Sequence, residues 1–316
     1  MSASARGGDL TDIADRVVGW AADGEEVEAV VGRSRHTEVR AYQSDVESLS
    51  SAETMGVGIR VVLGDRQGFA YAATFDDEVL AETLAEARDN ASFATPDPHV
   101  GLAAPDGVPV PELDLFRPSL LDMPTDRKIE LALELEAAVK AADDRISGVE
   151  SAEFVDAMGE SCVASTTGIR SESASTACYV AVSCLAEADG VTQTGFGFSV
   201  GRELDDLVLT DASDDAVMRA TRLLGATKPA STRTTIVLDP YVTAQVIGII
   251  GSTLSGEMVL KGRSPFAERL GEEVGSSLVT LVDDATNPLA YTASATDGEG
   301  LASRRTPLIS DGVLRS

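Results

Sequence analysis

Apolar and polar residues alternate along much of the first hundred positions, and helix-like spacing flanks this region. Strand-like alternation covers five stretches, at residues 26–31, 37–44, 45–50, 56–63 and 67–73. Apolar positions three or four residues apart predict helices over Leu10–Ala22, with Thr11 as the N-cap, and over Asp76–Ala91. We therefore expect an antiparallel sheet packed with helices in this part of the chain.

The middle of the chain continues with both patterns. One apolar stripe predicts a helix over Thr125–Ala142, with charged residues elsewhere on its surface. Alternation then predicts strands at residues 146–158, 160–166, 169–187 and 191–202. Ser213 is expected to cap another helix that turns Val217 and Ala220 inward.

The last part of the chain has a different order of elements. A strand is predicted over Thr234–Leu238, a buried helix over Pro240–Leu254 and a further strand over Ser277–Val282, with a Gly- and Ser-containing loop between the helix and the second strand. No fixed-period internal repeat is present in the sequence.

Proline-rich and small-residue segments predict the domain boundaries. Seven prolines lie between Thr95 and Pro124, where they favour a linker or an irregular crossover because proline interrupts both helices and central strands. Lys228–Ser231 marks a second boundary. The predicted domains are residues 1–110, 111–230 and 231–316.

These patterns place the protein in the α+β class. We expect several domains in which antiparallel or mixed sheets pack with helices, since 316 residues exceed what one core usually holds. The C-terminal domain is expected to be β-rich and incomplete.

Composition excludes several classes of function. The formal net charge of −27 repels phosphate backbones and anionic lipid surfaces, so we expect no direct nucleic-acid partner and no membrane. The apolar stretch Val242–Leu254 is too short to span a bilayer. Three cysteines without CxxC spacing, and an N-terminus without an apolar signal region, favour a cytoplasmic protein.

Several side chains suggest chemistry only weakly. Asp283, Asp284, Asp297 and Glu299 lack the spacing of a calcium loop, so no metal site is expected. A lysine followed by serine or threonine is missing after the glycine-rich stretch at residues 195–201, which favours a close-packed strand over a phosphate loop.

A thiol nucleophile is the third weak candidate. Cys162 paired with His36 or His99 would give a chelator-resistant peptidase, but no local signature supports the pair. A buried structural thiol is the simpler interpretation, so no catalytic residue is assigned.

Several segments, in this order and spacing, resemble the TldD/PmbA family. They are Thr37–Arg40, Val46–Ser48, Gly56–Arg60, Gln67–Tyr71, Ser255–Glu257, Lys261–Phe266, Leu270–Gly271, Asp297–Gly300 and Arg304–Thr306. The resemblance covers nearly the whole chain, and its third-domain part is the most specific. It also implies that family members continue beyond the point where this sequence stops, so a truncated or split reading frame is expected.

The resemblance implies a zinc-binding His-Glu-x-x-x-His helix in the TldD type and its absence in the TldE/PmbA type. The corresponding helix here reads Ile249–Gly256 and offers no imidazole, thiolate or carboxylate. The chain therefore resembles the TldE/PmbA type, with no cofactor of its own and with zinc expected only in a TldD-like partner.

From this resemblance we expect a non-catalytic subunit of a heterodimeric zinc peptidase that acts on unfolded peptides. Whether the chain has enzymatic activity of its own is left open. The alternative is a regulatory or binding protein, like a modulator of DNA gyrase, with no proteolytic partner. Residues expected to contact peptide or partner are Ser255, Gly256, Lys261, Arg263, Ser264, Asp297 and Glu299.

Overall fold

Two units make up the structure, a computed structural model that describes residues 4–316, with side chains from residue 9 onward. The first unit contains the chain up to residue 226 together with residues 288–303. The second contains residues 227–287 and 304–316. The three-domain division made from the sequence stays a prediction.

The first unit is built on a six-stranded antiparallel sheet with the strand order β3-β2-β1-β4-β5-β6. The strands are β1 (Glu26–Tyr42), β2 (Asp45–Leu63), β3 (Arg66–Ala72), β4 (Ile146–Ser165), β5 (Arg170–Ala188) and β6 (Val191–Gly201). The central pair, β1 and β4, joins the two halves of the sheet. The sheet edges are therefore β3 and β6.

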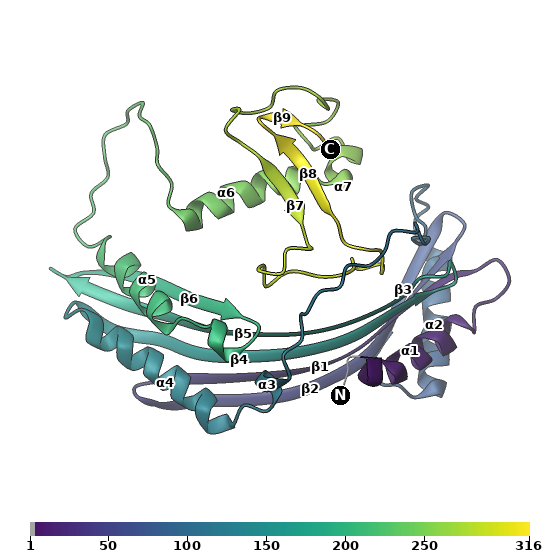
Figure 1. The fold of residues 1–316 in the computed structure, drawn as a ribbon, viewed down its shortest axis with the longest axis horizontal. Helices are drawn as coiled ribbons and strands as arrows, with labels where there is room; N and C mark the ends of the chain where they lie inside the picture. Colours follow the sequence, from purple (N-terminus) through teal and green to yellow (C-terminus); the bar gives the residue numbers. More distant parts are fainter. Residues whose placement is uncertain (1–3) are drawn as a thin grey trace. The chain divides into compact units, whose positions relative to one another are not determined.

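Helices flank each set of three strands. The first unit contains α1 (Ser4–Val18), α2 (Asp77–Phe93), α3 (Pro118–Leu121), α4 (Thr125–Ala142) and α5 (Leu209–Thr221), with a 3-10 turn at Leu204–Asp206. The order helix, three strands, helix thus occurs twice, as α1-β1-β2-β3-α2 and as α4-β4-β5-β6-α5 (Figure 1).

All the helices that contribute to the cores pack on one side of the sheet. Figure 1 shows α1, α2 and α4 along the convex side of the curved strands. Alternation along β1 directs Val27, Val31 and Val39 toward them, and all three are fully buried. The other side is here called the concave face, defined by the even-numbered residues of β1 from Glu28 to Arg40 and their cross-strand neighbours.

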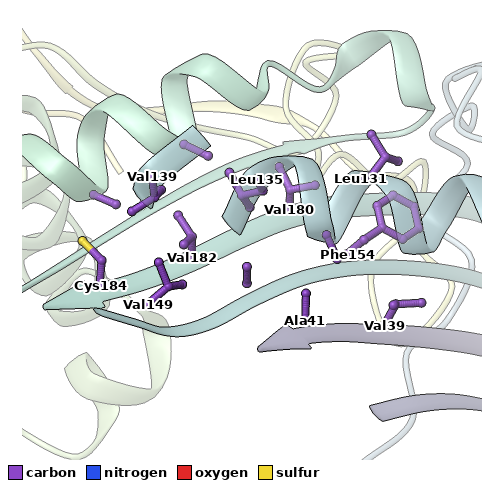
Figure 2. Packing of buried hydrophobic residues seen from close by; sticks show 14 of the residues in the cluster. Val39, Ala41, Leu131, Leu135, Val139, Val149, Phe154, Val180, Val182 and Cys184 are labelled. Atoms are coloured by element: carbon purple, nitrogen blue, oxygen red, sulfur yellow. The ribbon is translucent and has the colours of Figure 1, made fainter. Parts of the chain in front are cut away.

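Two separate clusters fill the helix side. One joins α1 and α2 to β1, β2 and β3, and includes Leu10, Ile59 and Leu84. The other joins α4 and α5 to β4 and β5, where Figure 2 shows Leu135 of α4 beside Val180. Burial of this apolar surface is the main force that holds the helices to the sheet.

Glycines allow two helices to approach the edge strands. A Cβ atom on Gly68 of β3 would lie 2.2 Å from the carbonyl oxygen of Ala87 in α2. A Cβ atom on Gly197 of β6 would lie 1.9 Å from the carbonyl oxygen of Ala212 in α5. Only glycine fits at these contacts.

The second unit contains shorter elements. They are α6 (Pro240–Thr253), α7 (Gly256–Leu260), β7 (Leu281–Asp284), β8 (Arg305–Ser310) and β9 (Val313–Leu314). The three strands form one antiparallel sheet, with Ile309 and Leu314 buried. By contrast, α6 has no buried residue, so the expectation of a buried helix there is wrong.

The α+β prediction is confirmed, as is the helix Thr125–Ala142. Four predicted short strands at residues 26–63 are two long ones, β1 and β2. Likewise, the separate strands predicted at 146–158 and 160–166 are one strand, β4. Among residues 4–316, every helix is too short or too polar to cross a membrane.

Three local predictions are wrong. Thr11 lies inside α1, which already begins at Ser4, and its hydroxyl bonds Glu172 instead of capping the helix. Ser213 lies inside α5, where its hydroxyl donates to the carbonyl of Thr210. The stretch Thr234–Leu238 is not a strand in the structure, and its Val237 is 91% exposed.

Candidate functional site

The concave face of the first unit offers a long surface that could hold an extended ligand. Its middle is lined by small side chains and hydroxyl groups, which form cross-strand hydrogen bonds between Ser34 and Thr54 and between Ser161 and Ser173. Such short side chains leave the floor low and polar. Larger aromatic and charged side chains lie toward the two ends of this face.

A groove of about 490 Å³ lies at the end formed by β1, β2 and β3. Val30, Phe69 and Tyr71 line it with apolar surface, and the two aromatic residues are 59% and 58% exposed. Large apolar side chains that remain this exposed beside one another are typical of binding surfaces.

Glycines form the floor of this groove. Gly32 and Gly56 are directly paired across β1 and β2, and Gly58 follows two positions later. A Cβ atom on Gly56 would lie 2.4 Å from the Tyr71 hydroxyl, and one on Gly58 would lie 3.1 Å from the Phe69 ring. The rings therefore lie over the glycines, in space that any larger residue would fill.

Arg33 and Glu160, paired at 2.7 Å, are the charged residues among those that line the groove, and a further charged cluster lies next to Phe69. Arg60, directly opposite Phe69 across β2 and β3, binds both carboxylate oxygens of Glu28 at 3.0 Å. The same guanidinium binds Glu299 at 2.5 Å. One cation thus serves two carboxylates at this corner.

A second acidic position lies further along the concave face. Burial raises the pKa of Glu153 in β4, and the neighbouring Glu38 carboxylate in β1 raises it further, against the opposing effect of Arg40. Burial also raises the pKa of Tyr179 in β5, with contributions from both carboxylates. Glu38 and Glu153 are diagonal neighbours on the concave face, because Glu38 pairs with Val155 and Arg40 pairs with Glu153 across β1 and β4.

Residues 288–303 are attached to the same unit by polar contacts. Arg202, just after β6, donates to the carbonyl oxygens of Ala290 and Tyr291 at 3.0 and 2.9 Å. Ser171 of β5 donates to the Thr296 hydroxyl at 3.1 Å. With the Arg60–Glu299 ion pair, these contacts fix the segment at several points.

The expected contact residues fall into two groups. Five of them surround α7 in the second unit, where Ser255 caps the helix by accepting from the Met258 amide. The Met258 carbonyl accepts from the amides of Arg263 and Ser264. Lys261 pairs with Glu257, and this contact lowers the pKa of the Glu257 carboxyl. This loop is therefore ordered by its own contacts.

The other two expected contact residues belong to the first unit. Asp297 accepts from the amides of Glu299 and Leu301, so its carboxylate shapes its own turn. Glu299 reaches Arg60 at the border of the groove. A peptide-contact role for all seven residues stays a prediction.

Acidic and thiol side chains were the weak candidates for a metal site or a nucleophile. No three His, Cys, Asp or Glu residues gather at metal-binding distances within the part of the chain that the structure describes. Burial raises the pKa values of Cys162, Cys178 and Cys184, to about 12 for Cys178 and about 11 for Cys184. Such thiols stay protonated near neutral pH and are poor nucleophiles.

Sequence reasoning missed the groove. In the sequence, Gly56–Arg60 and Gln67–Tyr71 were noted only as parts of the family resemblance. The available signal was the pairing of a Gly-x-Gly strand with a strand that carries two aromatic residues two positions apart. Because β2 and β3 are joined by a tight turn at Gly64-Asp65, their register follows from the sequence.

Most of the chain matches known proteins. Three family models match, described as PmbA/TldA metallopeptidase domain 1 at residues 27–91, central domain at 118–224 and C-terminal domain at 231–316. The metalloprotease PmbA of Escherichia coli O157:H7 is 25% identical over 92% of this chain. The chain spans 65% of the length of that protein.

Two solved structures share the fold. One, from Bacteroides thetaiotaomicron, is described as a candidate modulator of DNA gyrase and has a TM-score of 0.90 at 21% identity, over 98% of this chain and 71% of its own. The other is TldE from Thermococcus kodakarensis, with a TM-score of 0.78 at 21% identity, over 100% of this chain and 69% of its own. At this identity, the two structures support the fold alone.

Proposed function

Because the chain belongs to the PmbA/TldD family, we propose that it is a TldE/PmbA-type subunit of a TldD/TldE-type zinc metallopeptidase. In this proposal the complex cleaves unfolded peptides. The zinc and its ligands belong to a TldD-like partner, and this chain contributes surface for the peptide and for the partner.

The composition of α6 is the observation that carries this proposal. The resemblance places the zinc motif of the TldD type on this helix, and here its last turns contain Ile249, Gly251, Ser252 and Thr253. Aliphatic and hydroxyl side chains are not the ligands that hold catalytic zinc in proteins. The two histidines of the chain, His36 in β1 and His99 after α2, are far from this helix in sequence.

The concave face supports a role with extended substrates. An unfolded peptide presents its backbone and alternate side chains, and such a ligand suits a long, shallow surface more than a deep cavity. Serine and threonine hydroxyls such as Ser34 and Ser161 can exchange hydrogen bonds with a peptide of any sequence.

Reconstitution tests the proposal. Cleavage of casein or of an unstructured fluorogenic peptide is measured with this chain alone, with a TldD-like subunit alone, and with both, each with and without a chelator. We expect cleavage only in the mixture, and its loss on chelation. A Ser252→Ala variant serves as the matched control in α6 and should leave the rate unchanged. Cleavage by this chain alone would contradict the proposal.

A regulatory role is the second candidate, because the Bacteroides thetaiotaomicron protein that shares this fold is described as a candidate modulator of DNA gyrase. With a net charge of −27, such a role would act on a protein and not on DNA. It predicts altered supercoiling by gyrase in the absence of any metallopeptidase. An unchanged supercoiling rate at saturating amounts of this chain would remove this candidate.

A further inference from the structure

We propose that the groove over Gly32, Gly56 and Gly58 holds an apolar side chain of an extended, basic peptide, against the exposed faces of Phe69 and Tyr71. The inference rests on the proposed function, because it names the class of unfolded peptide that this subunit would select. The groove would then be a specificity site of the complex and not part of its chemistry.

The groove is formed before any ligand arrives. The Tyr71 and Phe69 side chains reach across to β2, where the Tyr71 hydroxyl donates to the Met55 carbonyl at 3.4 Å. Gly56 and Gly58 leave room for the rings beside the backbone of β2. Aromatic side chains in such positions dominate many binding sites.

The other half of the sheet shows that glycines are not required beneath aromatic residues on an edge strand. There, β6 carries Phe196 and Phe198, which are 39% and 47% exposed. The β5 residues opposite them are Ser183 and Ala181, so side chains fill the floor. The glycine floor is thus particular to the β1-β2-β3 end and accounts for the space that is found there.

Charge indicates that the peptide is basic. On the concave face, Glu28 and Glu299 share the single cation of Arg60. Glu38 and Glu153 are diagonal neighbours across β1 and β4, and the cation between them, Arg40, also pairs with Glu47. A lysine or arginine side chain beside either position would pair with carboxylates there. Glu38 lies six positions beyond Gly32 in β1, which is about 20 Å along an extended strand.

The test uses peptide binding by the full chain, separate from cleavage. Three labelled, unstructured peptides share one backbone: the first has a phenylalanine and an arginine about six residues apart, the second replaces phenylalanine with serine, and the third replaces arginine with glutamate. Affinities are measured by fluorescence anisotropy at two salt concentrations. The first peptide should bind most tightly, and its advantage over the third should shrink in high salt.

Two variants locate the site. Phe69→Ser should weaken binding of the first peptide about tenfold. Its affinity should then be close to that of the second peptide, which has serine in place of phenylalanine. Phe198→Ser, at the matching exposed position of β6, should leave all three affinities unchanged. Glu38→Gln combined with Glu153→Gln should reduce the preference for arginine over glutamate without changing the preference for phenylalanine.

The outcomes separate this inference from the proposed function. Equal weakening by Phe69→Ser and Phe198→Ser, or equal binding of all three peptides, would overturn the groove as a side-chain site even if the reconstituted pair cleaves casein. If Phe69→Ser changed only the self-association of the chain, measured by sedimentation, the groove would bind a second copy of the chain. That result would also overturn the peptide-binding inference. Selective binding without cleavage by the pair would retain the groove and reject the peptidase subunit.

Discussion

The two halves of the six-stranded sheet share one order of elements but differ in where they place their polar groups. In both halves, the second helix packs against the edge strand through a glycine, Gly68 or Gly197. The first half carries Arg60 and its two carboxylates on the concave face, beside the glycine-floored groove. The second half buries an ion pair on the helix side, between Lys128 of α4 and Asp156 of β4.

This difference shows that repeated architecture does not fix which face of a sheet becomes functional. Helix-side positions are constrained by packing in both halves, because each must bury an apolar cluster. Concave positions are free of that constraint, so they can diverge into a low aromatic groove in one half and a surface with Phe196 and Phe198 in the other. Four measurements would test how far the equivalence of the halves extends.

The largest effect is expected from the buried ion pair of the second half. The Lys128 Nζ and Asp156 Oδ2 atoms are 2.5 Å apart, and the two side chains are 6% and 2% exposed. Lys128→Met would leave the Asp156 carboxylate buried without its cation, so we expect a loss of about 3–5 kcal/mol in the free energy of unfolding. Urea denaturation measures it.

The double variant Lys128→Met with Asp156→Leu is the control, and it should recover most of that loss because no charge is left buried. In the first half, Arg88→Met should cost less, since Arg88 is 33% exposed although it binds Glu25 through two hydrogen bonds. Equal losses for Lys128→Met and Arg88→Met would contradict the asymmetry of the two halves.

Helix positions were more predictable from the sequence than strand lengths. The bounds of α4 follow from Pro124 and a regular apolar stripe, both of which are local. The breaks expected within β1 and β2 fall at polar stretches such as residues 32–36 and 51–55, which nonetheless pair with each other in register. Strand continuity there depends on partners distant in sequence, β4 above all, and no local pattern contains that information.

The next effect concerns the glycines that the two halves share. Gly68→Ala and Gly197→Ala would each place a Cβ atom against a helix backbone, at 2.2 and 1.9 Å. Because helix and strand must separate, we expect each to lose about 2–3 kcal/mol in the free energy of unfolding. Gly159→Ala in β4 is the control, since nothing lies within 4 Å of its Cβ position. A loss at only one of the two glycines would show that the halves are not equivalent in packing.

The candidate site was only partly predictable. The loop at Ser255–Ser264 was found through the resemblance, and the structure brings its residues together around the Met258 carbonyl. The groove required the register of three strands and the direction of each side chain. Glu299 shows the limit clearly, because its partner Arg60 is 239 residues away in sequence.

Helix capping gives a smaller contrast. In the first half, Asp76 caps α2 by accepting from the amides of Glu78 and Val79. In the second half, α5 begins after Val208, which makes no side-chain cap but has an extended backbone suited to one. We expect Asp76→Ala to cost about 1 kcal/mol and Val208→Ser to gain up to about 1 kcal/mol. Thermal unfolding of the two variants checks this, and a destabilising Val208→Ser would show that its exposed side chain has a packing role.

The smallest effect is a pH dependence that has opposite signs in the two halves. Hydrogen bonds from Arg88 lower the pKa of Glu25, against the opposing effect of burial, so its contribution to stability is present above the ordinary glutamate pKa of 4.5 and is lost as pH falls through the lowered value. Burial and Glu38 raise the pKa of Glu153, so its ionised form destabilises the folded state, and this penalty disappears as pH falls from the raised value to below 4.5.

Glu153→Gln should therefore stabilise the protein at pH 7, by less than about 1 kcal/mol because the group is only partly buried. The gain should vanish below pH 4.5, where the wild-type carboxyl is protonated in both the folded and unfolded states. Glu25→Gln should be destabilising at pH 7 and neutral in acid. Urea denaturation at both pH values measures the two differences. If Glu153→Gln is destabilising at pH 7, the carboxylate has a compensating partner, and the acidic character assigned to this part of the concave face is wrong.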